Sequence, residues 1–289
     1  MRLADILSGA DKPLLSCEFF PPKTDKGEEN LWQCLHELQA MSPAYISVTY
    51  GAGGTTQERT KRIVTRIKEQ TGLSPVAHLT CVGSTKEELS SLLDEYAKAG
   101  IENILALRGD APEGMEKFEA VDGGFSYATD LIDFVSQRGD FSIACATYPE
   151  GHPESKGGVE DDIRYLKTKQ DNGACCAVTQ YFFDNDTFFR FRDAAAQAGV
   201  TIPLIPGIMP ISNYAQIVRF SGMCGASIPA WIHEKMQPIQ DDLGAVKALG
   251  IELAIAQCQS LLSHDVAGLH FYTLNKSEAT LAISQALQS

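Results

Sequence analysis

Short apolar runs of strand length alternate along the chain with longer segments whose apolar residues recur at helical spacing. In the segment 27–41, for example, the apolar positions that fall on one helical face are Leu31, Cys34, Leu35, Leu38 and Met41. The runs that we predict to be strands cover residues 14–20, 44–50, 75–81, 103–108, 142–148, 175–182, 203–208 and 268–274. Such strict alternation requires a parallel sheet whose strands are joined by helical crossovers.

Helices are predicted between these runs. They cover 27–41, 56–71, 85–98, 127–137, 160–171, 186–198, a segment from 212, most of 227–265, and 277–287. Residues 111–124 and 149–158 contain Gly, Pro and Glu in loop-like clusters. Eight β/α units in 289 residues favour a closed barrel over an open sheet. We therefore predict an α/β protein with one (β/α)8 TIM-barrel domain over 1–289 and extra helices before the last strand.

Polar residues stand at the end of strand after strand. Those that end or follow the apolar runs are Glu18, Thr49, His78, Thr80, Arg108, Asp110, Tyr148 and Gln180. In a parallel barrel all these ends meet at one mouth, where active sites are built. The sequence therefore predicts that the chemistry is concentrated on one face of the barrel.

Composition narrows the classes of function. The net charge of −13 argues against nucleic acid or an anionic membrane as a general partner. We find no apolar run long enough to span a bilayer, and the N-terminus lacks a secretory apolar segment, so the cytoplasm is the expected location. The eight cysteines form no Cys-x-x-Cys pair and are expected to be buried, reduced thiols. The six histidines show no metal-binding spacing, so no metal is expected.

Three local patterns carry candidate chemistry, and each also has a plain structural interpretation. The glycines of 51–56 allow close approach of a ligand, although they match no dinucleotide fingerprint and could form a simple turn. Arg108 and Asp110 flank Gly109, which suits either phosphate binding or a local ion pair.

Glu18 is the candidate general acid. Strand alternation places Glu18 and Phe20 on the same side, where an aromatic wall would desolvate the carboxyl group and raise its pKa. A raised pKa keeps part of the group protonated, as a general acid requires. The plain alternative is a salt bridge at the rim of the barrel.

Taken together, these stretches resemble the methylenetetrahydrofolate reductase family over nearly the whole chain. The matching segments are 18–23, 47–52, 78–81, 106–110, 148–154, 179–184, 205–210 and 271–275. The resemblance implies a β/α barrel that binds FAD, takes hydride from NADH or NADPH, and reduces methylenetetrahydrofolate by a ping-pong reaction. It implies a short, bacterial-type enzyme without an appended regulatory domain, an acidic homo-oligomer, and a product that supplies methyl groups for methionine synthesis.

The resemblance also implies roles for individual residues. Glu18 matches the general acid, and Asp110 matches the catalytic carboxylate beside the flavin and the pterin. The positions that match flavin contacts are Tyr50, Ala52, His78, Arg108, Gly109, Asp110, Tyr127, Ala128, Tyr148, His152, Asp162 and Lys169. The positions that match contacts to nicotinamide or folate are Glu18, Thr49, Asp110, Gln180, Tyr214 and Lys276.

This chain departs from the family pattern at two of these positions. Tyr214 replaces a familiar Phe, and a phenol can still stack on a pterin-type ring. Lys276 replaces a familiar Arg, and a lysine offers a point charge instead of a planar fork.

Two other readings of the sequence stay open. One is a cofactor-free barrel lyase or transferase that acts on a pterin or a phosphorylated substrate. The other is a protein that binds flavin or folate without catalysis. Bound flavin would exclude the first alternative, and bleaching of the flavin by NADH would argue against the second.

Overall fold

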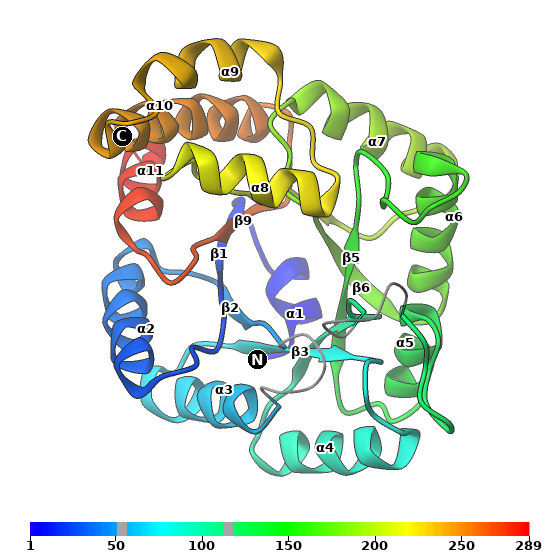
Figure 1. Ribbon diagram of the computed structural model, residues 1–289. Helices are drawn as coiled ribbons and strands as arrows, with labels where there is room; N and C mark the ends of the chain where they lie inside the picture. The colour runs from blue at the N-terminus through cyan, green and yellow to red at the C-terminus, as the bar shows by residue number, and fades with distance from the viewer. Residues whose placement is uncertain (51–56, 112–117, 289) are drawn as a thin grey trace.

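The computed structural model describes residues 1–50, 57–111 and 118–288 and shows a ring of parallel strands enclosed by a ring of helices (Figure 1). The strands are β1 (Leu14–Phe19), β2 (Tyr45–Val48), β3 (Pro75–Thr80), β4 (Asn103–Leu107), β5 (Ser142–Thr147), β6 (Ala174–Thr179), β7 (Leu204–Ile205), β8 (Gly207–Ile208) and β9 (Gly268–Tyr272). They are ordered β7-β6-β5-β4-β3-β2-β1-β9-β8.

The ring closes through the short stretch that holds β7 and β8. β7 pairs with β6, while β8 pairs with β9 on the other side. Pro206 separates the two segments, and its carbonyl oxygen accepts a hydrogen bond from the backbone N–H of His270 at 2.9 Å. The single strand predicted at 203–208 is therefore divided at a proline, which has no N–H to give to a ladder. The predicted barrel is confirmed.

Helices surround the barrel. They are α1 (Leu3–Ser8), α2 (Asp25–Leu38), α3 (Gln57–Thr71), α4 (Lys86–Lys98), α5 (Ala128–Ser136), α6 (Gly158–Asp171), α7 (Asn185–Gln197), α8 (Tyr214–Cys224), α9 (Ala230–Met236), α10 (Leu243–Leu262) and α11 (Glu278–Gln288), with 3₁₀ turns at Gln39–Met41 and Gln237–Ile239. Thr85 begins α4 with a capping box to Glu88, which confirms the predicted start of that helix. The extra helices before the last strand are α9 and α10.

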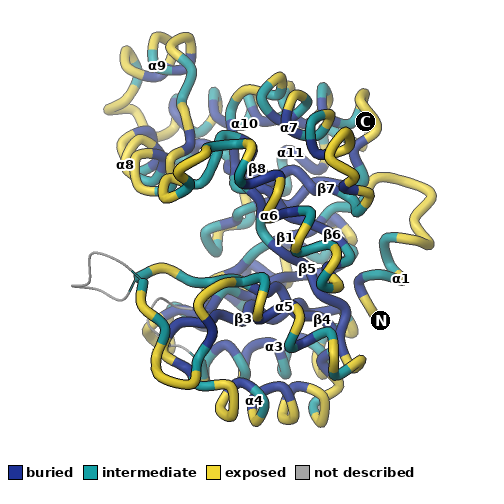
Figure 2. The backbone as a smooth tube through the Cα atoms, turned by 90° about the vertical axis from the view of Figure 1, so that its right-hand side faces the viewer, coloured by how far each residue is buried: buried dark blue, intermediate teal, exposed yellow. Residues whose placement is uncertain are grey.

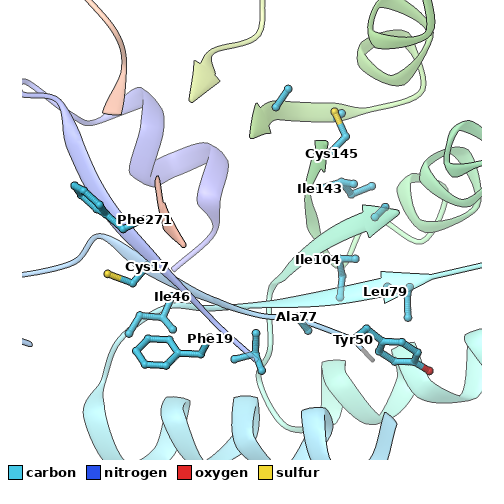
Figure 3. Close-up of a cluster of buried hydrophobic side chains, with 14 of the residues drawn as sticks. Cys17, Phe19, Ile46, Tyr50, Ala77, Leu79, Ile104, Ile143, Cys145 and Phe271 are labelled. Atoms are coloured by element: carbon cyan, nitrogen blue, oxygen red, sulfur yellow. The ribbon is translucent and has the colours of Figure 1, made fainter. Parts of the chain in front are cut away.

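Strand alternation separates an outer core from a barrel interior. Outward positions such as Cys17, Phe19, Ile46, Leu79 and Phe271 pack against the helices in one large cluster (Figure 3). The positions between them face inward. The lower interior is filled by Leu3, Tyr45, Val76, Leu105, Ala144, Cys176, Val178 and Ile205.

Helix α1, which the sequence pattern did not predict, supplies Leu3 to this interior and covers one end of the barrel (Figures 1 and 2). The backbone N–H of Leu3 donates to the Asn103 side chain at 2.6 Å. Six residues are too few for a clear helical period, which explains why the pattern missed it. Because α1 covers one end, the interior opens toward the carboxyl ends of the strands.

Helix α10 corrects the expectation that no apolar run could span a bilayer. It is 20 residues long, and an 18-residue window within it has a mean hydropathy of 1.2, so the helix could cross a membrane by length and composition alone. In the barrel α10 is one of the surrounding helices and packs against α11 and α7. The prediction of buried thiols is confirmed for six of the eight cysteines, whereas Cys175 and Cys224 are half-buried.

Candidate active site

Register brings an inward-facing polar cluster together near the carboxyl ends of β1, β2, β3 and β9. Glu18 pairs with Ser47 on one side and with Tyr272 on the other, while Ser16 pairs with His270. His78 follows Val76 by two residues on β3, so it faces the same interior. Inward positions that are apolar lower in the barrel thus become polar at this level.

Glu18 lies between two histidines. Its Oε2 is 3.3 Å from Nε2 of His78 and 3.6 Å from Nε2 of His270. The Ser47 hydroxyl donates to the same oxygen at 3.4 Å. His78 and His270 are buried, and the Glu18 side chain is only 17% exposed. The contact with His78 lacks the alignment of a hydrogen bond, since its Nε2 has no such partner among the described residues.

The predicted environment of Glu18 was wrong. Phe20 lies beyond the end of β1 and is 43% exposed, so it builds no apolar wall. Burial by itself raises the pKa of Glu18, but the imidazoles of His270 and His78 outweigh it and lower the pKa to about 2. The resting carboxyl group is therefore ionised at neutral pH.

A large cavity opens at the ends of β4 and β5, at the same end of the barrel. Its volume is about 760 Å³, within the range of cofactor sites. Predicted flavin contacts line it: Arg108, Tyr127, Ala128, Tyr148, His152, Asp162 and Lys169. The structure thus gathers seven of the predicted positions from four separate segments into one wall.

Arg108 and Gly109 occupy the turn after β4. The Arg108 guanidinium forms a two-pronged ion pair with Glu154, at 2.6 and 3.0 Å. Gly109 has φ of +87°, and a Cβ there would lie 2.7 Å from Val82 Cγ2, so only glycine fits this turn. Asp110 follows, is exposed, and does not line the cavity.

His152 and Asp162 are fixed by the loop before α6. The backbone N–H of His152 donates to Asp162 Oδ2 at 2.6 Å, and the backbone N–H of Glu154 donates to Nδ1 of His152 at 3.1 Å. Burial and the nearby Arg108 lower the pKa of His152, which favours the neutral ring, with Nδ1 as the acceptor. Burial raises the pKa of Asp162. Tyr148 packs edge-on against His152 at 4.6 Å.

Lys276 lies on the far side of the mouth, after β9. It lines a second cavity of about 440 Å³ together with Phe20, Asn30 and Ser277. The Asn275 side chain ties this loop to the end of β1, because it accepts from the Phe20 N–H at 3.1 Å and donates to the Phe20 carbonyl at 2.9 Å.

The remaining predicted positions are more scattered. Tyr50 packs in the outer core, where burial raises its pKa to about 12. Tyr214 is buried in a cluster beneath α8 and α9, with its hydroxyl 2.6 Å from Nδ1 of His233. Thr49 and Gln180 are half-buried after β2 and β6. Ala52 and the glycines of 51–56 lie outside the described residues.

Sequence reasoning missed His270, Ser47 and Ser16, which complete the surroundings of Glu18. The available signal was a polar residue within an apolar strand at an inward position, as in Leu269-His270-Phe271. Glu154 was also missed, although it stands in a polar loop before α6. Among the described residues, no group of three or more His, Cys, Asp or Glu side chains is arranged to hold a metal ion.

Comparison with solved structures supports the fold. A Clostridium thermocellum protein described as binding two copies of 5-methyl-5,6,7,8-tetrahydrofolic acid superposes with a TM-score of 0.66 at 13% identity, covering 98% of this chain and 97% of that one. Dihydropteroate synthase from Stenotrophomonas maltophilia superposes with a TM-score of 0.54 at 10% identity, covering 96% and 92%. At such identities the likeness concerns the fold alone.

Proteins found by sequence comparison share a much larger fraction of identical residues with this chain. The 5,10-methylenetetrahydrofolate reductase of Escherichia coli K12 is 41% identical over 273 residues, which is 94% of this chain and 90% of that protein. Methylenetetrahydrofolate reductase (NADH) 1 of Arabidopsis thaliana is 42% identical over 93% of this chain, which spans only 47% of the plant protein. The family model for methylenetetrahydrofolate reductase matches residues 2–288. The chain therefore belongs to the methylenetetrahydrofolate reductase family.

Proposed function

We propose that this protein reduces 5,10-methylenetetrahydrofolate to 5-methyltetrahydrofolate, with FAD as cofactor and NADH or NADPH as the source of hydride. The observation that carries the proposal is the cavity at the ends of β4 and β5, lined by the positions that match the family's flavin contacts. Relatives of about 40% identity carry the name of this reductase.

The cavity suits FAD in size and in chemistry. Arg108 and Lys169 offer cationic donors for a pyrophosphate, and the guanidinium fork suits phosphate oxygens. In the structure, the Lys169 ammonium group donates a hydrogen bond to the carbonyl oxygen of Ala146 at 2.8 Å. The exposed ring of Tyr127 and the ring of Tyr148 offer surfaces for stacking. When bound, FAD would accept hydride from NADH or NADPH and pass it to the folate, which is chemistry that the protein's own side chains cannot provide.

Glu18 is assigned the proton transfer to folate. The methylene carbon of the substrate bridges two nitrogens, and opening that ring requires a proton on the nitrogen that leaves. The electron pair of the breaking C–N bond goes to that nitrogen, and the resulting iminium carbon accepts hydride. Glu18 is partly buried near the mouth and can deliver such a proton once it has received one.

Lys276 and Asp110 are assigned to the ligands in the mouth. Lys276 would contact the nicotinamide or folate ligand from the loop after β9, where the second cavity lies. Asp110, in the turn after β4, would act as the carboxylate beside the flavin and the pterin. The proposal includes the homo-oligomer that the resemblance implies and the cytoplasmic location expected from the sequence.

Flavin release and anaerobic reduction test the proposal. The purified protein should be yellow, should release FAD on heating, and should bleach when NADH or NADPH is added without oxygen. Methylenetetrahydrofolate should then restore the colour. Arg108→Ala should retain less FAD, whereas Arg219→Ala, on the exposed side of α8, should retain as much as the natural protein. A protein that binds no flavin after reconstitution would contradict the proposal and favour a cofactor-free lyase or transferase.

A further inference from the structure

Arg108, the residue proposed to hold the pyrophosphate, already has an anionic partner in the structure. Its Nη1 lies 2.6 Å from Oε2 of Glu154, and its Nη2 lies 3.0 Å from Oε1. Two parallel N–H···O bonds of this kind are the strongest arrangement of a guanidinium and an oxyanion. Among the ion pairs of the described residues, this is the one whose two members both line the cavity at β4 and β5.

The guanidinium of Arg108 is held on its other sides as well. Its Nε donates to the carbonyl oxygen of Gly109 at 3.3 Å, and its central carbon lies 5.5 Å from the centre of the Phe118 ring. A phosphate binds to an arginine fork through the same two parallel N–H groups that a carboxylate uses. The N–H groups that face Glu154 therefore cannot serve a phosphate at the same time.

The other acidic residues that line the cavity have partners elsewhere. Asp161 lies 2.7 Å from the guanidinium of Arg164, which does not line the cavity. Asp162 accepts a backbone N–H of the loop before α6 at 2.6 Å. In the described part of the chain, Glu154 is thus the acidic side chain that lies within ion-pair distance of Arg108.

The backbone of Glu154 is fixed, whereas its side chain is free to leave. The backbone N–H donates to Nδ1 of His152 at 3.1 Å. The preceding Pro153 packs on Gly225 at the end of α8, where an added Cβ would lie 2.8 Å from Pro153 Cγ. The Glu154 side chain is 56% exposed, so its carboxylate can turn into water without a large loss of free energy.

We propose that Glu154 is an internal competitor of the cofactor, because its carboxylate occupies the Arg108 fork in the empty cavity and must leave before a pyrophosphate can bind there. The inference rests on the proposed function for the identity of the cofactor. Each binding event exchanges one oxyanion for another at Arg108. The free energy of the lost ion pair is subtracted from that of binding. Glu154 therefore lowers the affinity for FAD and speeds its release.

Fluorescence titration of the apoprotein with FAD tests this inference. Glu154→Gln keeps the size of the side chain and removes its charge, so FAD should bind about twofold to fivefold more tightly, the range set by one exposed ion pair. The matched control is Glu160→Gln, which removes an exposed charge at the start of α6 outside the cavity lining and should leave the affinity unchanged. If Glu154 instead orients Arg108, Glu154→Gln will bind FAD more weakly. That result, or an affinity equal to the control, would overturn the inference.

Ionic strength gives a second readout. In the natural protein the number of ion pairs at Arg108 stays the same when a pyrophosphate replaces the carboxylate. In Glu154→Gln the guanidinium gains an anionic partner that it lacked before. Added salt should therefore weaken FAD binding more steeply in Glu154→Gln than in the natural protein. Parallel salt dependences would contradict the exchange of anions.

A double-mutant cycle separates competition for Arg108 from simple repulsion of the cofactor. In an Arg108→Ala background there is no guanidinium to occupy, so Glu154→Gln should improve FAD binding less than it does in the natural protein. An equal improvement in both backgrounds would mean that Glu154 acts on FAD by its charge alone, which would overturn the inference.

Inorganic pyrophosphate distinguishes a failure of this inference from a failure of the proposed function. If neither the natural protein nor Glu154→Gln binds FAD after reconstitution, the proposed function is wrong. Calorimetric titration with pyrophosphate then still decides the role of Glu154. Tighter binding to Glu154→Gln than to Glu160→Gln would support the competition, whereas equal or absent binding would overturn it.

Discussion

At the scale of single residues, the chemistry of a carboxyl group is decided by its neighbours. Glu18 has little exposure, and burial alone would make it a weaker acid. The imidazoles of His78 and His270 have the opposite effect, and they lower the pKa of Glu18. The residue type and its strand-end position were readable in the sequence, but the reversal depends on His78 and His270, which are 60 and 252 positions away along the chain.

Replacing Glu18 should affect one half-reaction only. Glu18→Gln keeps the shape of the side chain but has no proton to release. Reduction by NADH should continue at a comparable rate, because hydride passes directly between two aligned rings. Reoxidation by methylenetetrahydrofolate should slow by about 10²–10⁴-fold, the usual contribution of a positioned acid. Stopped-flow absorbance resolves the two halves, and equal losses in both would mean that Glu18 only maintains the structure of the site.

Asp110 should tune the flavin by its charge. A carboxylate near the isoalloxazine disfavours additional negative charge on the ring, so Asp110→Asn should raise the reduction potential. Removal of one partly solvated charge corresponds to a few tens of millivolts for a two-electron couple. Spectroelectrochemical titration of the reconstituted protein gives this value. An unchanged potential would place Asp110 away from the ring, in line with its position outside the lining of the cavity.

Lys276 should serve the ligands that pass through the mouth. Lys276→Ala should raise the KM for NADH or for methylenetetrahydrofolate several-fold. The substitution removes a contact to the ligand whose energy is about that of one exposed ion pair or slightly more. FAD content should stay the same, because Lys276 does not line the cavity at β4 and β5. Steady-state kinetics with each substrate varied would detect the effect, and two unchanged KM values would leave Lys276 as a surface lysine.

At the scale of elements, close contacts with the backbone of a neighbouring segment decide how large a side chain a helix position can hold. Hydropathy does not reveal these contacts. Gly250 on α10 lies against the carbonyl oxygen of Ile211, so a side chain there would force the helix away from the barrel. A Cβ added to Gly222 on α8 would meet no heavy atom within 4 Å outside the helix's own backbone. Both are glycines within apolar helical patterns, and only the packing of the helices distinguishes them.

This difference predicts opposite effects on stability. Gly222→Ala should raise the free energy of unfolding by about 0.5–1 kcal/mol, because alanine loses less conformational freedom in a helix. Gly250→Ala should lower it by about 1–3 kcal/mol or more through overpacking. Urea unfolding followed by circular dichroism measures both. Equal effects would mean that α10 is not seated against residue 211 as described.

At the scale of the whole molecule, the alternation of strands and helices was enough to predict the barrel and the end at which polar residues gather. Closure through a strand divided at Pro206 was not predictable, because it depends on two different neighbours of one short segment. The candidate site was also predictable only in part. Seven predicted positions share one cavity, but Tyr214 turns to His233, and His270 was overlooked because its role depends on strand register.

Acid stability of the whole protein should depend on the charge of Glu18. The pKa of this group falls from about 4.5 to about 2 on folding, so its ionised form stabilises the native state above pH 4.5. That contribution, an upper bound of about 3 kcal/mol, is lost as the pH falls from 4.5 to about 2. The free energy of unfolding should therefore drop more steeply over this range in the natural protein than in Glu18→Gln. The exposed Glu252→Gln on α10 is the matched control and should follow the natural protein. Parallel curves for natural protein and Glu18→Gln would mean that the two histidines do not hold the carboxylate in its charged form.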